Sequence, residues 1–210
     1  MDIVDYVKDS PLKTFRRGEV LLQKGESNQH LMALRTGFLK VTSINSDGVE
    51  RLVWLPGRYD IAPTERLFSK SGTVRFFYTA LTDGSYYQLD KQEFLTLAEQ
   101  RPELMAEIAR GMSDHYDDLL QHIDAIDATS VRERLLLTLL YLAERISADE
   151  TVDLCEHGLV LTHADFANLI GSTRETTSLT LNRIREEGFI DYSRGRCIVF
   201  TKKIRSDFDL

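Results

Sequence analysis

The residues best placed to do chemistry in this sequence are polar side chains on one face of a predicted helix. Arg174, Glu175, Ser178 and Asn182 follow one another at the spacing that brings side chains onto the same side of a helix. Arginine can donate two hydrogen bonds to guanine, and glutamate can accept one from cytosine, so adjacent positions offer two base-edge chemistries. The pattern predicts a surface that reads bases in the major groove of double-stranded DNA.

The elements that must position this face are two short helices between residues 161 and 184. Thr162 and Asp165 can cap the first helix, Gly171 permits a sharp turn, and Ser172 with Glu175 forms a second capping box. The apolar faces of the two helices should pack together, with Thr177, Leu181 and Ile184 against Phe166, Leu169 and Ile170. This arrangement predicts a helix-turn-helix.

Each polar position also has a plainer interpretation. Arg174 and Glu175 could only solvate the helix surface, Glu175 could be only a cap, and Ser178 could hold a phosphate rather than a base. Phosphate contacts would set the position of the protein on DNA without reading its sequence. The residues that we assign to the DNA backbone around the two helices are Thr162, His163, Thr173 and Asn182.

A β-hairpin is predicted after the second helix. Glu187-Gly188 ends that helix, and the segments 189–192 and 197–200 read as two strands with Arg194 and Arg196 at the tip between them. Such a hairpin forms the wing of a winged helix-turn-helix. The two arginines either contact the DNA backbone or are ordinary turn residues.

The charge distribution agrees with a DNA-binding segment at this end of the chain. The whole chain carries a formal net charge of −7, yet residues 171–205 hold eight basic and four acidic residues. A local basic patch on an acidic protein can contact phosphates while limiting unspecific binding.

Residues 1–100 have an all-β pattern. Short segments rich in β-branched and aromatic residues alternate with glycine-containing turns such as Lys24-Gly25, Thr36-Gly37 and Asp83-Gly84. The predicted strands are 20–22, 31–34, 38–41, 51–55, 76–81 and 86–89. Closely spaced strands with regular turns predict a barrel, roll or sandwich.

A long helix is predicted to begin at Pro102. Its seam positions are spaced alternately by three and four residues: Met105, Ile108, Met112, His115, Leu119, His122 and Ile126. This spacing favours pairing with a second copy in a parallel dimer, although a helix packed on its own domain would show a similar stripe. In such a dimer His115 and His122 would each face the same residue of the second copy. There they either sense protons or a metal ion, or fix the register of the two helices. Ser130 with Glu133 predicts the cap of the next helix and a hinge before it.

Taken together, these elements resemble the CRP/FNR family of bacterial transcription regulators. The resemblance is most specific from Leu161 to Phe200, and segments 17–20, 24–26, 37–41 and 56–57 are similar to the cyclic-nucleotide-binding β-roll. It implies an α+β fold with an N-terminal antiparallel β-roll (a double-stranded β-helix), a long dimerisation helix and a C-terminal winged helix-turn-helix. The expected boundaries are 1–100 for the roll, 101–128 for the dimerisation helix and hinge, and 129–210 for the DNA-binding domain. It also implies a homodimer on a palindromic operator, with RNA polymerase as a further partner if the protein activates transcription.

At three places the sequence departs from the family pattern, which limits the functional properties that the resemblance implies. The turn that would hold cyclic AMP reads Asp60-Ile61-Ala62-Pro63-Thr64-Glu65, in which Pro63 removes a backbone donor, and only Arg75 remains as a residue of a possible effector pocket. Two cysteines cannot supply the four ligands of an iron-sulfur cluster. We therefore expect neither cyclic AMP nor a cluster, and the effector stays unidentified. Leu179 stands where the family usually has arginine, so we expect it to touch a thymine methyl and to change the preferred base pair.

The remaining features bound the functional class. There is no signal peptide or membrane-spanning run, and Cys155 and Cys197 have no neighbours at metal-ligand spacing, so we expect a cytoplasmic protein without a metal site. The sequence contains no nucleophile elbow, no His-Glu metal motif and no phosphate loop, so we do not expect an enzyme. The alternative function is a ligand-binding signalling module that uses its winged helix for protein contacts, which would expose apolar anchors where this face is polar.

Overall fold

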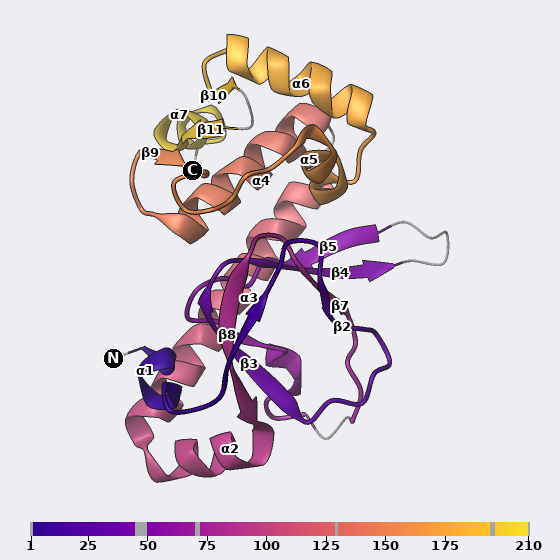
Figure 1. Cartoon of the computed structure of the whole chain (residues 1–210). Helices are drawn as coiled ribbons and strands as arrows, with labels where there is room; N and C mark the ends of the chain where they lie inside the picture. Colours follow the sequence, from indigo (N-terminus) through magenta and orange to yellow (C-terminus); the bar gives the residue numbers. More distant parts are fainter. Residues whose placement is uncertain (1, 45–49, 70–71, 129, 194–195, 210) are drawn as a thin grey trace. The chain divides into compact units, whose positions relative to one another are not determined.

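The computed structural model describes residues 2–44, 50–69, 72–128, 130–193 and 196–209, and the chain divides into two compact units (Figure 1). The first unit comprises Met1–Ser43 and Val53–Asp117, and the second comprises Ile44–Leu52 and Asp118–Leu210. The long helix α3 (Pro102–Asp127) therefore contributes its first part to one unit and its last part to the other. As predicted, it begins at proline, which needs no amide hydrogen bond in a first turn.

Two four-stranded sheets form the β-roll, with orders β1-β8-β3-β6 and β2-β7-β4-β5. The strands are β1 (Leu12–Phe15), β2 (Val20–Leu22), β3 (His30–Thr36), β4 (Leu39–Ile44), β5 (Glu50–Trp54), β6 (Ile61–Ala62), β7 (Phe77–Ala80) and β8 (Gly84–Asp90). Neighbours such as β3 and β8 pair antiparallel. In β8 the side chains of Ser85, Tyr87 and Leu89 are buried while those between them are partly exposed, as expected for a strand with one face on a core.

The antiparallel roll and its turns are confirmed, but the all-β pattern up to residue 100 is wrong in two places. The helices α1 (Ile3–Val7) and α2 (Lys91–Gln100) lie within that range. Phe94 and Ala98 of α2 are buried in the same apolar cluster as Leu31 and Leu89 of the first sheet. Asp90, the last residue of β8, caps α2 by accepting hydrogen bonds from the amides of Gln92 and Glu93.

The seam predicted for α3 lies partly against the chain's own first unit. Ile108 is only 3% exposed in the core, and the His115 ring lies 4.0 Å from the Trp54 ring. Ile108 therefore packs on its own unit, the alternative that the apolar spacing left open, whereas the seam role of His115, which is partly exposed, stays a prediction. Met105 packs on the core and Leu119 is half-buried, while the side chains of His122 and Ile126 lie outside the described residues. The exposed large apolar residues among the described side chains of α3, here called the α3 strip, are Met112, Tyr116 and Leu120.

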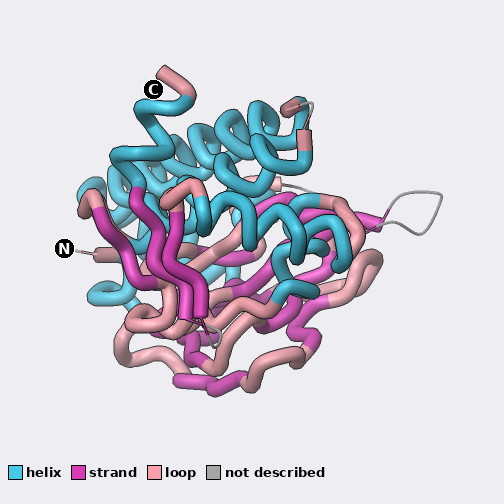
Figure 2. The backbone as a smooth tube through the Cα atoms, turned by 90° about the horizontal axis from the view of Figure 1, so that it is seen from above, coloured by secondary structure: helices cyan, strands magenta, loops and turns pink. Residues whose placement is uncertain are grey.

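Besides the last part of α3, the second unit contains four helices and a small sheet among its described residues. The helices are α4 (Val131–Ile146), α5 (His163–Ile170), α6 (Arg174–Glu186) and α7 (Thr201–Asp207), and the sheet has the order β10-β11-β9. Its strands are β9 (Thr151–Asp153), β10 (Ile190–Ser193) and β11 (Arg196–Phe200), seen side by side in Figure 2. The capping box of Ser130 and Glu133 at the start of α4 is confirmed. Among the described helices, none is long and apolar enough to cross a membrane.

Two fully buried threonines in the second unit differ in how their hydroxyls are satisfied. Thr177 is completely buried, and its Oγ1 has no hydrogen-bond partner among the described residues. Thr201 is 1% exposed, and its Oγ1 donates to the carbonyl oxygen of Asp149 at 3.0 Å. Because a buried polar group without a partner keeps its full desolvation cost, the two hydroxyls should contribute to stability with opposite signs.

We expect Thr177→Val to raise the free energy of unfolding by about 1 kcal/mol, since valine has nearly the same shape without the unpaired hydroxyl. Thr201→Val, the matched control, should lower the free energy of unfolding by about 1 kcal/mol because it leaves the Asp149 carbonyl without its donor. Urea denaturation of the full chain measures both values. Equal destabilisation by the two substitutions would contradict this account.

Candidate nucleic-acid interface

The turn between α5 and α6 sets the direction of the second helix. Gly171 adopts the left-handed conformation, with φ of 61°, at the end of α5, as the sequence predicts. Thr162 caps α5 and exchanges hydrogen bonds with Asp165, which confirms the first capping box. The predicted cap of α6 is wrong by one residue: Thr173, and not Ser172, accepts a hydrogen bond from the Thr176 amide, at 3.2 Å. The amide of Ser172 is still engaged by the Ala167 carbonyl, so Ser172 belongs to the turn.

The inner face of α6 is fully buried. Thr177, Leu181 and Ile184 are at most 1% exposed, and α6 packs on both α4 and α5. On α5, Phe166, Leu169 and Ile170 are buried, so the predicted packing faces are confirmed. This burial fixes the rotation of α6 about its own axis, and the opposite face therefore points away from the unit (Figure 1).

The outer face of α6 carries most of the residues that were predicted to read bases. Arg174, Glu175 and Asn182 are exposed, and Leu179 is 73% exposed. No hydrogen bond or ion pair joins the Arg174 side chain to any other described residue. Its guanidinium is therefore available to a ligand. Thr173, predicted to contact the DNA backbone, lies exposed at the start of the same helix.

Ser178 differs from its neighbours because its hydroxyl is held within the protein. Ser178 Oγ and His163 Nδ1 are 2.7 Å apart, which is hydrogen-bonding distance. The His163 ring in turn lies 5.2 Å from the ring of Tyr192 on β10, and the Tyr192 hydroxyl donates to the Leu161 carbonyl. Through these contacts His163, the first residue of α5, joins α6 to β10.

The predicted hairpin is confirmed, and a strand that was not predicted extends it to a three-stranded sheet. Ile190 pairs with Val199 across β10 and β11, and β9 adds the third strand beside β11. Arg194 lies outside the described residues. Arg196 is bonded to Asp153 of β9, at 2.5 Å, and lies 3.8 Å from Glu156.

The ion pair of Arg196 with Asp153 limits the ability of this arginine to bind a DNA phosphate. Although burial alone would raise the pKa of Asp153, hydrogen bonds from Arg196 and from the Cys155 amide bring that pKa below its usual value. Asp153 therefore stays ionised and competes with a phosphate for the arginine. Because β9 was not predicted, the sequence could not reveal this competition.

Ion pairs also neutralise most other cations near α6. Arg183 bonds Glu187 at 2.9 Å, Lys202 bonds Glu150 at 3.0 Å, and Arg205 bonds Glu144 at 2.8 Å. Arg185 instead donates only to the Tyr192 carbonyl, at 3.4 Å, and remains exposed. It lies eleven residues after Arg174, which is about three helical turns, and so shares its side of α6. Sequence reasoning missed Arg185, although this spacing was visible.

The interior of the β-roll is filled by apolar side chains, and Trp54 and Tyr78 are among the largest of them. Tyr78 is completely buried and its hydroxyl donates to Glu65 at 2.8 Å; burial and the Glu65 charge raise the Tyr78 pKa well above its usual value. A cavity of about 30 Å³ beside Trp54, Asp60 and Thr64 has room for about one water molecule. Arg75, predicted to border an effector pocket, is exposed and lines none of the cavities described here.

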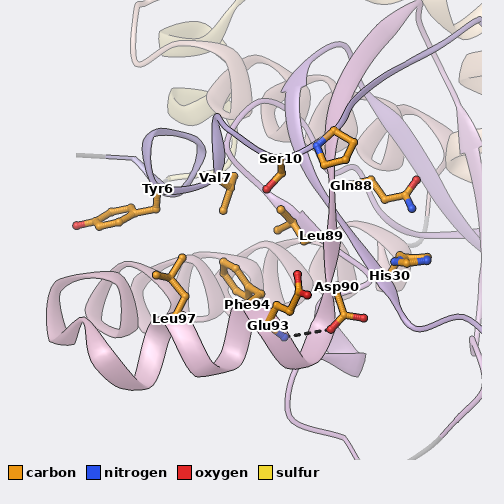
Figure 3. A pocket seen from close by; sticks show the side chains of 11 residues that line it. Tyr6, Val7, Ser10, His30, Gln88, Leu89, Asp90, Glu93, Phe94 and Leu97 are labelled. Carbon is orange, nitrogen blue, oxygen red and sulfur yellow. Dashed lines mark hydrogen bonds between the residues drawn. The ribbon is translucent and has the colours of Figure 1, made fainter.

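A larger hollow of about 350 Å³ lies between α1, α2 and the first sheet (Figure 3). Apolar side chains such as Val7, Leu89 and Phe94 line it together with the polar residues His30 and Glu93. The hollow is separate from the interior of the roll, and no residue predicted for a site lies in it. Among the described residues, no group of three histidine, cysteine or acidic side chains is arranged to hold a metal ion.

Comparison with known proteins places these features in a family. The model of the Cyclic nucleotide-binding domain matches residues 12–101, and that of the Crp-like helix-turn-helix domain matches residues 133–203. Electron transport regulator A of Shewanella oneidensis is 25% identical over 187 residues, covering 89% of this chain and 73% of that protein. The CRP-like cAMP-activated global transcriptional regulator of Mycobacterium tuberculosis is 25% identical over 177 residues, covering 84% and 78%.

A solved structure shares the fold. FixK2 from Bradyrhizobium japonicum aligns with a TM-score of 0.76 at 16% identity, covering 94% of this chain and 96% of that one. The two matched domains stand in the same order as the β-roll and the winged helix described above. The chain is a member of the CRP/FNR family of transcription regulators, with a DNA-binding helix-turn-helix.

Proposed function

We propose that the protein acts as a homodimer that places the α6 helix of each copy in the major groove of a palindromic operator. The observation that carries this proposal is the outer face of α6, where Arg174 and Arg185 lie three turns apart and neither is paired with an acidic side chain among the described residues. The base-reading residues are Arg174, Glu175 and Leu179, with Ser178 held in place by His163. Two such helices read half-sites about one turn of DNA apart.

The remaining assigned residues bind the DNA backbone. Thr162, Thr173 and Asn182 lie exposed around α5 and α6, and Arg185 replaces the paired Arg196 as the main phosphate-binding cation. The polar outer face also argues against the alternative of a protein-binding winged helix, because Leu179 is the one large apolar side chain exposed among the described residues of α6. RNA polymerase is the further partner if the bound protein activates transcription.

The α3 strip supports the homodimer. Met112, Tyr116 and Leu120 are 41%, 61% and 44% exposed and follow one another at intervals of four residues. An apolar stripe at this spacing gains stability when a second helix covers it. The homodimer proposal leaves the effector unidentified. The buried side chains of Tyr78 and Trp54 occupy the interior of the roll, where a large ligand would need space.

Selection of bound sequences from a random duplex library tests the central proposal. We expect enrichment of a palindrome whose half-sites are one helical turn apart. Recovery of no motif, or of a single unrepeated half-site, would contradict the dimeric reading of DNA.

Arginine substitutions on α6 should separate base reading from phosphate binding. We expect Arg174→Ala to relax the preference at one base pair per half-site at a cost of about 1–3 kcal/mol. Arg185→Ala should weaken all sequences alike and reduce the slope of log affinity against log salt by about one per copy. Arg183→Ala is the matched control, because that guanidinium is paired with Glu187. Binding affinities for matched and mutated duplexes, measured over a range of salt concentrations, distinguish the two roles. An equal loss of affinity for all duplexes in Arg174→Ala would contradict its role as a base reader.

Leu179 should determine how this operator differs from that of other family members. We expect Leu179→Arg to shift the preference at one base pair toward guanine, because arginine can donate to its O6 and N7 atoms. Library selection with the variant measures the shift. Leu179→Met, which keeps an apolar tip, serves as the control and should retain the original motif. An unchanged motif in both variants would exclude a base contact at this position.

Breaking the α3 strip should separate the two copies. We expect Tyr116→Asp to lower dimer affinity at least about tenfold, because it places a charge within an apolar contact. Phe68→Asp is the matched control, since Phe68 is 53% exposed but lies outside α3. Sedimentation velocity at several concentrations gives the dissociation constants. Equal effects of the two substitutions would show that the strip is not the dimer contact.

A further inference from the structure

Arg66 is an unusual residue in the first unit because two nitrogens of its guanidinium are buried without a hydrogen-bond partner among the described residues. The side chain is 3% exposed, and neither Nε nor Nη1 has a hydrogen-bond partner among the described residues. Its neighbour Glu65 forms no ion pair with it among the described residues: Glu65 Oε2 accepts the Tyr78 hydroxyl, and Glu65 Oε1 is itself buried without a hydrogen-bond partner. A buried guanidinium is strongly disfavoured unless an anion compensates it. Among the described residues, no carboxylate forms an ion pair with Arg66, so the charge of its guanidinium is not directly compensated.

Arg66 borders an open cavity of about 400 Å³ that contains a second cation. Lys91, at the first position of α2, also lines this cavity, and its Nζ donates to the Ser69 carbonyl at 2.7 Å. Burial and the positive charge of Arg66 lower the Lys91 pKa. The two cations thus repel each other across the cavity, and an anion between them would stabilise both.

The carboxylate at the same cavity is already engaged. Asp90 Oδ1 accepts hydrogen bonds from the amides of Gln92, at 2.8 Å, and Glu93, at 3.0 Å; the second is the dashed line in Figure 3. Asp90 therefore serves the start of α2, and its single charge does not balance the two cations. The side chains of Gln29 and Gln92 at the cavity wall add neutral amide donors.

We propose that this cavity binds a small oxyanion, the phosphate or carboxylate group of a metabolite, between the Arg66 guanidinium and the Lys91 ammonium. Both anions match the planar donor set of arginine, and lysine adds a point charge. The volume fits a metabolite rather than a bare ion, since small-molecule sites commonly span several hundred cubic ångströms. The site lies in the first unit, apart from the interior of the roll, and its occupancy does not depend on DNA binding.

Thermal unfolding of the full chain without DNA tests the proposal. Inorganic phosphate and succinate are titrated separately, each against sodium chloride of equal ionic strength. We expect at least one of the two to raise the unfolding midpoint progressively beyond the chloride reference, as a ligand that binds the folded state must. A response to phosphate alone identifies a phosphate-bearing ligand, and a response to succinate alone identifies a carboxylate. A midpoint that follows chloride in both arms overturns the proposal.

Two variants assign the effect to the cavity. Arg66→Met should abolish the shift, and Lys91→Gln, which keeps a donor for Ser69, should raise the apparent Kd at least about tenfold. Lys13→Gln is the control, because Lys13 is an exposed cation on β1 that should leave the shift unchanged. If Arg66→Met does not fold, Lys91→Gln decides alone. A wild-type shift in Lys91→Gln would overturn the site, and none of these results bears on whether α6 reads DNA.

Discussion

The proposed DNA-reading surface depends on the burial of one face of α6. Thr177, Leu181 and Ile184 are enclosed against α4 and α5, so the helix cannot rotate without exposing two large aliphatic side chains to water. Burying each such side chain stabilises the packing by about 1.5–3 kcal/mol. The orientation of Arg174 and Leu179 is therefore a consequence of apolar packing on the other side of the same helix.

The features encoded by local pattern were the ones that sequence could predict. The apolar faces of α5 and α6, the Thr162 cap, the left-handed Gly171 and the start of α3 at Pro102 all follow from spacing or from single-residue geometry. Predictions were wrong or left open where a segment distant in the sequence determines which residues are buried. Ile108 lies on the correct helical period, yet the core of its own unit covers it. The helix α1 has only five residues, and α2 buries only Phe94 and Ala98, so neither gives a clear apolar period.

Which cations are free to bind an anion also depends on the fold. The count of basic residues near the C-terminus treats every arginine and lysine alike, whereas pairing with Glu144, Glu150, Asp153 and Glu187 leaves few of them for a polyanion. Several of those acids come from segments outside the basic stretch. The net charge of a segment therefore overstates its affinity for nucleic acid, and the position of unpaired cations is the better guide.

The contact between Ser178 and His163 has a consequence for protein engineering. Recognition helices are often treated as cassettes that can be exchanged between scaffolds, on the assumption that the helix carries all of its specificity. Here the Ser178 hydroxyl is bound by a residue of α5, which in turn lies against Tyr192 of the wing. Transplanting α6 alone would leave that hydroxyl without its acceptor or donor, so a chimaera needs His163 and Tyr192 as well to reproduce the same side-chain arrangement.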